Sequence, residues 1–292
     1  MYHIVINPKA GGRKSRKQIA LLYNYLKENG IEHRMYFSEK SKHMTDIAAK
    51  LTSGGKSCNL VVMGGDGTFN EALAGIADFK NTTVGFVPSG SGNDFAKMMG
   101  LKLEAVAAFE DILKAKTGSI DYIECGKLKS INVVSTGLDT EVLIKYNNAK
   151  VFRGKIAYML ALLITLLCFK FYKFHIKADD KEYKGEYVLA ACCNGSGFGG
   201  GIPVSPRSDI TDGLINLVMI KKIKKIRIPL LLLKLLRGKH LGEDWAEEVM
   251  CKTVSIKTLG SPELLETDGE LYDNAPFEAK VVAGGLKVFL PG

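Results

Sequence analysis

The chain has 292 residues, of which 46% are hydrophobic, and this is enough for a sizeable core divided between two ordinary domains. Its six cysteines form no Cys-x-x-Cys pair and have no histidines at metal-ligand spacing, which argues against a zinc site and against a disulfide framework. The first residues show no secretory signal, so we expect a cytoplasmic protein.

The formal net charge of +9 is concentrated in two windows that are also rich in apolar residues. Seven Lys or Arg lie between Glu141 and Asp179, eight lie between Asp212 and Glu243, and neither window contains an acid. Cations mixed with apolar residues favour an anionic membrane surface as a partner. They do not favour nucleic acid, whose binders more often mix cations with aromatic residues. We therefore expect a location peripheral to the inner face of the membrane.

The first third of the chain alternates short apolar runs with longer amphipathic segments, which predicts the strand-helix order of a parallel α/β sheet. The expected strands are "YHIVINP", "IEHRMYF", "NLVVMGG" and "TTVGFVP". Most of the turns after these strands are rich in glycine or polar residues, as in "NPKAGGRKS", "GGDGTFN" and "PSGSGNDF". In an open α/β sheet such turns lie at the carboxyl ends of the strands, where ligands bind.

From about Ser119 the pattern changes to strands joined by tight turns, which predicts a second, mainly antiparallel β domain. We place the α/β domain at residues 1–120, completed by 281–292, and the β-rich domain at 121–280.

Two helical segments, residues 154–169 and 223–237, interrupt the second domain. The uncharged run between Lys155 and Lys170 has 14 residues, fewer than the roughly 18 to 20 that a spanning helix needs. It is either a buried core helix, a wall of an apolar cleft or an interfacial anchor. The second segment is basic and then leucine-rich, which fits a membrane-facing surface or a helix packed on the sheet.

The stretch "GGDGTFN" has the features of a phosphate cradle. Gly64, Gly65 and Gly67 allow backbone N–H groups to approach an anion, and Thr68 starts a predicted helix whose amino end favours negative charge. Asp66 would repel a bare phosphate, so a cation such as the magnesium of a nucleotide is expected between them. The alternative is that Asp66 caps the helix that follows.

The stretch "GGDGTFNEALAG", followed by "GFVPSGSGNDFAK", resembles the diacylglycerol kinase catalytic domain family. NAD kinases share the Gly-Gly-Asp-Gly-Thr part, whereas the Pro-x-Gly-Ser-x-Asn-Asp-Phe part is similar to that of the lipid kinases. The likeness continues with "NPKAGG", "SID", "GKIAYMLALL", "CNGSGFGGGIPVSPRSDITDGLINLVMI" and "ETDGE". It implies a Rossmann-like α/β domain of the NAD kinase and phosphofructokinase type and a C-terminal antiparallel β-sandwich.

The resemblance also implies how ATP and Mg²⁺ are bound. Asp66, Asp94 and Asp121 match the acids around the magnesium and its waters, and each follows or ends a predicted strand. The positions that match ATP contacts are Asn7, Pro8, Lys9, Ala10, Gly11, Ser38, Gly64, Gly65, Asp66, Gly67, Thr68, Phe69, Asn70 and Ser91.

The stretch "DITDGL" matches a second, structural magnesium site. By the resemblance, Asp212 supplies its side chain and the positions of Asp209 and Leu214 supply further oxygen ligands. The sequence alone equally allows a tight Asp-Gly turn between two strands.

The stretch "TDGE" matches the catalytic segment, in which Asp268 and Glu270 lie near the acceptor hydroxyl. One of them is expected to be the general base. Alternation places both side chains on one face if the segment is extended, so the spacing does not tell them apart. A plain Asp-Gly turn is again the alternative.

The function implied is an ATP- and Mg²⁺-dependent lipid kinase of phospholipid metabolism, with diacylglycerol converted to phosphatidic acid as the leading expectation. The alternatives are a kinase of another lipid alcohol (sphingosine-like, phosphatidylglycerol or undecaprenol), an NAD kinase, or a non-catalytic sensor of nucleotide or lipid. The acceptor and the oligomeric state, including a homodimer, are open at this point.

Overall fold

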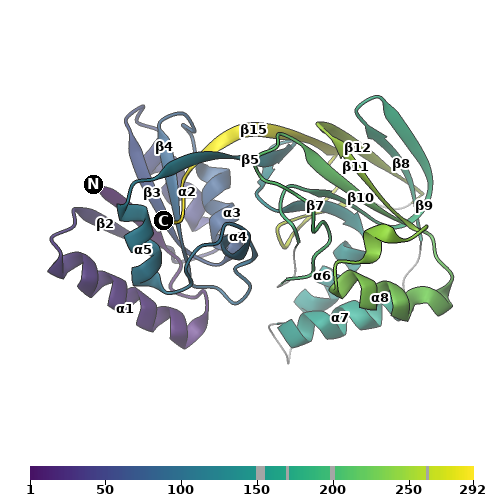
Figure 1. Ribbon diagram of the computed structural model, residues 1–292, viewed down its shortest axis with the longest axis horizontal. Helices are drawn as coiled ribbons and strands as arrows, with labels where there is room; N and C mark the ends of the chain where they lie inside the picture. The colour runs from purple at the N-terminus through teal and green to yellow at the C-terminus, as the bar shows by residue number, and fades with distance from the viewer. Residues whose placement is uncertain (149–154, 169–170, 198–200, 261–262) are drawn as a thin grey trace. The chain divides into compact units, whose positions relative to one another are not determined.

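The computed structural model describes residues 1–148, 155–168, 171–197, 201–260 and 263–292, which form two compact units (Figure 1). The first unit contains Met1–Ile120 and Gly284–Gly292, and the second contains Asp121–Ala283. Two strands, β5 (Thr117–Cys125) and β15 (Phe277–Phe289), have residues in both units.

The first unit is built on a parallel sheet in the order β2, β1, β3, β4, beside which the end of β15 pairs in parallel through Val288 and Val84. Almost every residue of β3 and β4 is buried, as expected for a parallel sheet covered on both faces. The strands are β1 (Tyr2–Ile6), β2 (His33–Phe37), β3 (Cys58–Gly64) and β4 (Thr82–Pro88).

Helices follow the strands of this unit. Leu22 and Leu26 of α1 and Phe109 of α5 form one apolar cluster with Ile4, Ile6 and Met63 of the sheet. Phe69 of α3 packs on Phe86 of β4, with ring centroids 5.0 Å apart. The helices are α1 (Gly12–Glu28), α2 (His43–Thr52), α3 (Asp66–Gly75), α4 (Asp94–Met98) and α5 (Ala105–Leu113).

The second unit contains antiparallel strands arranged around the long strand β9 (Lys181–Cys193). The first half of β9 pairs with β8, and its second half pairs with β7 on one side and β10 on the other. A buried cluster that includes Phe174, Ile176, Leu217 and Ile256 fills the interior. The other strands are β6 (Leu128–Ser130), β7 (Val133–Gly137), β8 (Tyr172–Ala178), β10 (Ile215–Lys221), β11 (Ala246–Cys251), β12 (Thr253–Leu259), β13 (Leu264–Thr267) and β14 (Glu270–Asp273).

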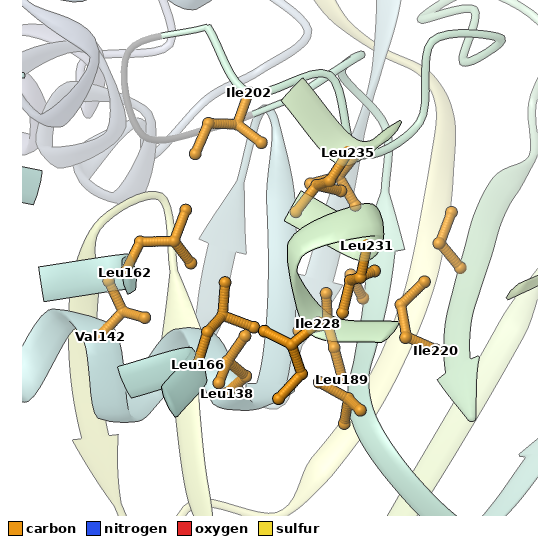
Figure 2. Packing of buried hydrophobic residues seen from close by; sticks show 14 of the residues in the cluster. Leu138, Val142, Leu162, Leu166, Leu189, Ile202, Ile220, Ile228, Leu231 and Leu235 are labelled. Carbon is orange, nitrogen blue, oxygen red and sulfur yellow. The ribbon is translucent and has the colours of Figure 1, made fainter. Parts of the chain in front are cut away.

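Three helices and two short 3-10 turns complete the second unit: α6 (Leu138–Asn148), α7 (Lys155–Cys168), η1 (Lys225–Arg227), α8 (Ile228–Leu236) and η2 (His240–Gly242). Figure 2 shows Leu162 and Leu166 of α7 and Leu231 of α8 directed into one apolar cluster, which also contains Leu189 of β9 and Ile220 of β10. The two predicted helical segments are therefore present, although residues 154 and 169 lie outside the described residues. In the described part of the chain, no helix combines the length and the apolar character that a membrane span requires.

This architecture confirms the predicted fold class, a parallel α/β unit and an antiparallel β-sandwich unit.

Candidate functional site

The turns after β1, β3 and β4 meet at the carboxyl ends of the parallel strands. The backbone N–H of Ser89 donates to the carbonyl of Gly64 at 2.7 Å, which ties the turn after β4 to the end of β3. The Asn7 side chain donates to the Thr68 hydroxyl at 3.1 Å, which ties the turn after β1 to the first turn of α3. Three of the predicted ATP-binding stretches thus form one assembly.

Glycines make this close approach possible. A Cβ atom on Gly90 would lie 2.5 Å from the Cα of Gly65, closer than such atoms pack. A Cβ atom on Gly11 would collide with the carbonyl oxygen of Ser89, and the φ of Gly11 is 66°, a conformation that glycine adopts readily. The result is a cradle lined by backbone, which fits the predicted phosphate-binding role.

A cavity of about 210 Å³ lies beside the first of these turns. It is smaller than the roughly 300 Å³ or more of a typical small-molecule pocket, so it fits part of a nucleotide. Its walls include three of the predicted ATP contacts, Asn7, Lys9 and Ser38. Glu39, Lys40, Ser41 and Glu71 also line it, and they were not predicted.

Asp66 does not cap its own helix. It is the first residue of α3, whose N-cap is Gly65, and its carboxylate accepts a hydrogen bond of 3.0 Å from the backbone N–H of Phe95 in α4. Burial, together with the negative charge of Asp94, raises the pKa of Asp66. Two neighbouring carboxylates repel each other, and a hard divalent cation such as Mg²⁺ bound between them would relieve the repulsion.

The turn after β4 also contains a residue that the sequence analysis missed. The Asn93 side chain accepts from the backbone N–H of Gly90 and donates to its carbonyl, both at 3.0 Å, and so closes the turn that contains the exposed Ser91. Asn93 has a φ of 52°, a left-handed conformation in which asparagine is enriched. The Gly-Asn-Asp sequence was the available signal.

Asp121 lies in the second unit, close to the "DITDGL" loop. Its carboxylate accepts from the backbone N–H of Gly213 at 2.6 Å. Burial raises the pKa of Asp212, and the negative charges of Asp209 and Asp121 raise it further. The Asp212 carboxylate accepts from the backbone N–H of Leu214 at 2.9 Å. The structure therefore brings Asp121 to the predicted structural-magnesium loop, and its grouping with Asp66 and Asp94 stays a prediction.

The "TDGE" segment is a hairpin turn, which matches the alternative of an Asp-Gly turn, so the alternation of an extended segment does not apply to it. Thr267 and Glu270 are cross-strand partners in β13 and β14, and the two residues between them, Asp268 and Gly269, have φ values of 47° and 92°. Positive φ at both central residues is the mark of a type I′ turn, for which Asp-Gly is a preferred sequence.

Asp268 and Glu270 have different environments. The Asp268 carboxylate accepts from the backbone N–H groups of Ile131, Asn132 and Val133 at 2.8 to 3.1 Å, and desolvation raises its pKa to about 6. Glu270 is partly exposed and accepts from the Tyr272 hydroxyl at 2.8 Å. Asp268 ties the turn to the start of β7, whereas Glu270 has one hydrogen bond, to the neighbouring Tyr272.

Across the residues that the structure describes, no three His, Cys, Asp or Glu side chains lie close enough together to hold a metal ion.

Comparisons with protein-family models cover nearly the whole chain. Residues 1–125 match the diacylglycerol kinase catalytic domain, and residues 132–290 match the YegS C-terminal NAD kinase beta sandwich-like domain.

Known proteins resemble the chain over a similar extent. A diacylglycerol kinase of Bacillus subtilis (strain 168) is 26% identical, with 99% of this chain and 95% of that protein covered. A diacylglycerol kinase of Mycobacterium tuberculosis is 27% identical, with 84% of this chain and 80% of that protein covered.

Solved structures agree on the fold. The crystal structure of a putative diacylglycerol kinase from Bacillus anthracis str. Sterne has a TM-score of 0.79 at 24% identity, with 99% of this chain and 96% of that chain covered. An NAD kinase from Archaeoglobus fulgidus in complex with ATP has a TM-score of 0.55 at 10% identity, with 100% and 94% covered. At these identities the likeness concerns the fold alone.

Proposed function

Because the chain belongs to the diacylglycerol kinase catalytic domain family, we propose that it is a lipid kinase that transfers the γ-phosphate of ATP to a lipid hydroxyl with the help of Mg²⁺. The observation that carries the proposal is the meeting of three turns at Gly11, Gly64–Gly65 and Ser89–Gly90, beside the cavity lined by Asn7, Lys9 and Ser38.

The first unit supplies the nucleotide-binding part. Backbone N–H groups of the glycine turns can hold phosphate oxygens, because such groups are donors in a conformation that leaves room for the ligand. Asp66 and Asp94 would hold the cation, which when bound offsets the charge of the phosphates.

The second unit supplies the acceptor-activating group. The Glu270 carboxylate accepts the proton of the lipid hydroxyl, the hydroxyl oxygen bonds to the γ-phosphorus, and the bond from that phosphorus to the bridging oxygen of ADP breaks. Asp268 does not take this proton, since both of its oxygens already accept backbone N–H bonds.

Diacylglycerol is the acceptor that we propose first, because similar proteins from two genera are named diacylglycerol kinases. The product would be phosphatidic acid.

A membrane surface is the proposed partner, because α8 has apolar side chains on both of its faces. Leu231 and Leu235 are buried, whereas Leu230, Leu233 and Leu236 are 40 to 45% exposed. Exposed apolar side chains next to Arg237 and Lys239, which are also exposed, fit an anionic bilayer. The helix α7 has the same feature, with Leu160, Leu163 and Ile164 exposed.

An acceptor screen tests the proposed reaction. The protein is incubated with radiolabelled ATP, Mg²⁺ and micelles that contain diacylglycerol, sphingosine, phosphatidylglycerol or undecaprenol, with NAD as a soluble acceptor. We expect labelled phosphatidic acid, its loss on chelation of the metal, and its loss in Glu270→Gln. Label in another lipid would replace diacylglycerol as the acceptor. Label in NAD alone, or in no acceptor, would refute the lipid kinase.

A further inference from the structure

Three buried polar side chains lie next to the hairpin turn that precedes Glu270. Ser135 is on β7, Asp139 is in the first turn of α6, and Glu266 is on β13 opposite Ser135 in the antiparallel pair. The exposed fractions are 0% for Ser135, 5% for Asp139 and 4% for Glu266. Water therefore does not screen the charges of the two carboxyl groups.

The hydroxyl of Ser135 contacts both carboxyl groups at hydrogen-bond distance. It lies 2.6 Å from Glu266 Oε2 and in close contact with Asp139 Oδ2. A serine hydroxyl has a single proton, so it donates to only one of these oxygens. The other contact is a hydrogen bond only if that carboxyl group is protonated and donates to Ser135 Oγ.

The surroundings favour Glu266 as the protonated member. Asp139 lies at the amino end of α6, where the helix dipole favours a negative charge. Burial raises the pKa of Asp139 to about 6, and burial together with the charge of Asp139 raises the pKa of Glu266 well above its usual value. Three further groups interact with the pair: the thiol of Cys193, the carboxyl group of Asp268 and the hydroxyl of Tyr172, which donates to Glu141. In the described residues no cation forms an ion pair with either carboxyl group.

The same Glu266 side chain holds the turn. Its second oxygen, Oε1, accepts from the backbone N–H of Gly269 at 2.5 Å. The neighbouring Asp268 binds the backbone N–H groups at the start of β7, the strand that carries Ser135. Displacement of Glu266 would therefore move Gly269 and the residue after it, Glu270.

We propose that Glu266, Ser135 and Asp139 form a buried proton-sharing chain, with the proton on Glu266, that positions the hairpin turn for catalysis by Glu270. Glu266 donates to Ser135, Ser135 donates to Asp139, and the free oxygen of Glu266 anchors Gly269. These are positioning residues that do not touch the substrate. The inference rests on the proposed lipid kinase function for its catalytic consequence, although the proton-sharing chain itself does not.

Infrared spectroscopy tests the shared proton without reference to activity. At pH 7.5 the wild-type protein should show the carbonyl stretch of a protonated carboxylic acid, which Glu266→Gln should remove and Asp139→Asn should keep. The absence of this band from the wild type, or its survival in Glu266→Gln, would overturn the proposal.

Kinetics with diacylglycerol micelles test the positioning. Ser135→Ala should lower kcat about 10- to 100-fold and leave the KM for ATP unchanged, because small displacements of a catalytic group cost about this much. Glu266→Gln keeps a donor toward Ser135 and an acceptor toward Gly269, so it should retain more activity than Ser135→Ala. In the wild type, ionisation of Glu266 at alkaline pH should lower kcat. Glu266→Gln should lack this fall of kcat.

The matched control is Ser205→Ala, since Ser205 is also fully buried and also donates to a glutamate, Glu248, at 3.0 Å. It should reduce stability to a similar degree without the loss of kcat. An equal loss of kcat in both serine variants, or no loss in Ser135→Ala, would refute the positioning role. A wild-type protein that phosphorylates no lipid would refute the proposed function instead, while the infrared result would still decide the proton-sharing chain.

Discussion

At the residue scale, the hairpin turn separates two acids that are two positions apart in the sequence. Both residues are partly exposed, but the Asp268 carboxylate accepts three backbone N–H bonds, whereas the Glu270 carboxylate accepts one bond from the Tyr272 hydroxyl. A carboxylate that already accepts three backbone N–H bonds is a poorer general base than one that accepts a single hydroxyl, so we propose the structural role for Asp268 and the chemical role for Glu270.

This assignment makes a prediction about stability. Asp268→Asn places an amide donor near the backbone N–H groups that the carboxylate now accepts, which should cost about 1–3 kcal/mol of the free energy of unfolding. Glu270→Gln should leave that free energy within about 0.5 kcal/mol, as at other surface positions, and abolish transfer. Urea unfolding and the kinase assay measure both effects. Destabilisation by Glu270→Gln, or an Asp268→Asn protein that is stable and inactive, would contradict the assignment.

For Asp66 we expect the opposite effect on stability from that of Asp268, because its replacement by asparagine should not destabilise the protein. Asparagine at this position can still accept from the backbone N–H of Phe95, and it removes a partly buried charge next to Asp94. We expect Asp66→Asn to unfold at the same temperature or a higher one, with kcat/KM reduced about 100-fold or more because the cation loses a ligand. Full activity in Asp66→Asn would remove this residue from the proposed metal-binding pair.

At the element scale, the glycine turns work as a unit, because each is shaped by the turn beside it. Gly90→Ala would place a methyl group 2.5 Å from the backbone of Gly65 and force the turns after β3 and β4 apart. We expect at least tenfold weaker ATP binding, roughly 1.4 kcal/mol, by calorimetry. The control is Gly54→Ala, which has open space and no positive φ. Equal ATP affinity in the two variants would count against the cradle.

The helix α8 is the second element with a testable role. Replacing both Leu230 and Leu233 with glutamine keeps the helix propensity and removes exposed apolar surface. Each leucine side chain can contribute about 2 kcal/mol when buried in lipid, so co-sedimentation with phosphatidylglycerol vesicles should fall about tenfold or more. Leu21→Gln, an exposed leucine of α1, is the control. Unchanged sedimentation of the double variant, or equal sedimentation with phosphatidylcholine vesicles, would argue against the membrane role.

At the scale of the whole molecule, carboxyl groups with raised pKa values make the stability of the second unit depend on pH. Glu266, whose pKa is raised well above its usual value, acts in the same direction as the two that follow. The pKa values of Asp139 and Asp268 are both raised to about 6, so the folded chain binds these protons more tightly than the unfolded chain does. The resulting stabilisation is complete below the unfolded pKa of about 4 and is lost as the pH rises through about 6.

The free energy of unfolding of this unit should therefore be about 1–3 kcal/mol lower at pH 6.5 than at pH 4.5. Trp245 is the one tryptophan of the chain and is buried in this unit, so its fluorescence during urea unfolding measures the change. Asp139→Asn should reduce the dependence on pH. A free energy that instead rises over this range would contradict the raised pKa values.

Much of the architecture could be predicted from local patterns. The apolar runs "NLVVM" and "TTVGFV" became the buried strands β3 and β4, and the turns after them were placed correctly because glycine and asparagine have distinctive backbone preferences. The resemblance to a family predicted the site residues, and their roles stay predictions. It could not separate Asp268 from Glu270, and the local sequence left an extended segment and an Asp-Gly turn both open until the structure showed the turn.

The sequence by itself determined the two kinds of sheet, the glycine turns and the basic, leucine-rich helices, since periodicity and backbone preference are properties of neighbouring residues. Only the tertiary structure decided which acids share an environment. It placed Asp121 beside Gly213, tied Asp66 to Phe95, and brought Ser135 and Asp139 to Glu266 from a strand and a helix more than a hundred residues away. Burial and hydrogen bonding between distant segments set the charge and the role of a carboxyl group, and no local pattern contains them.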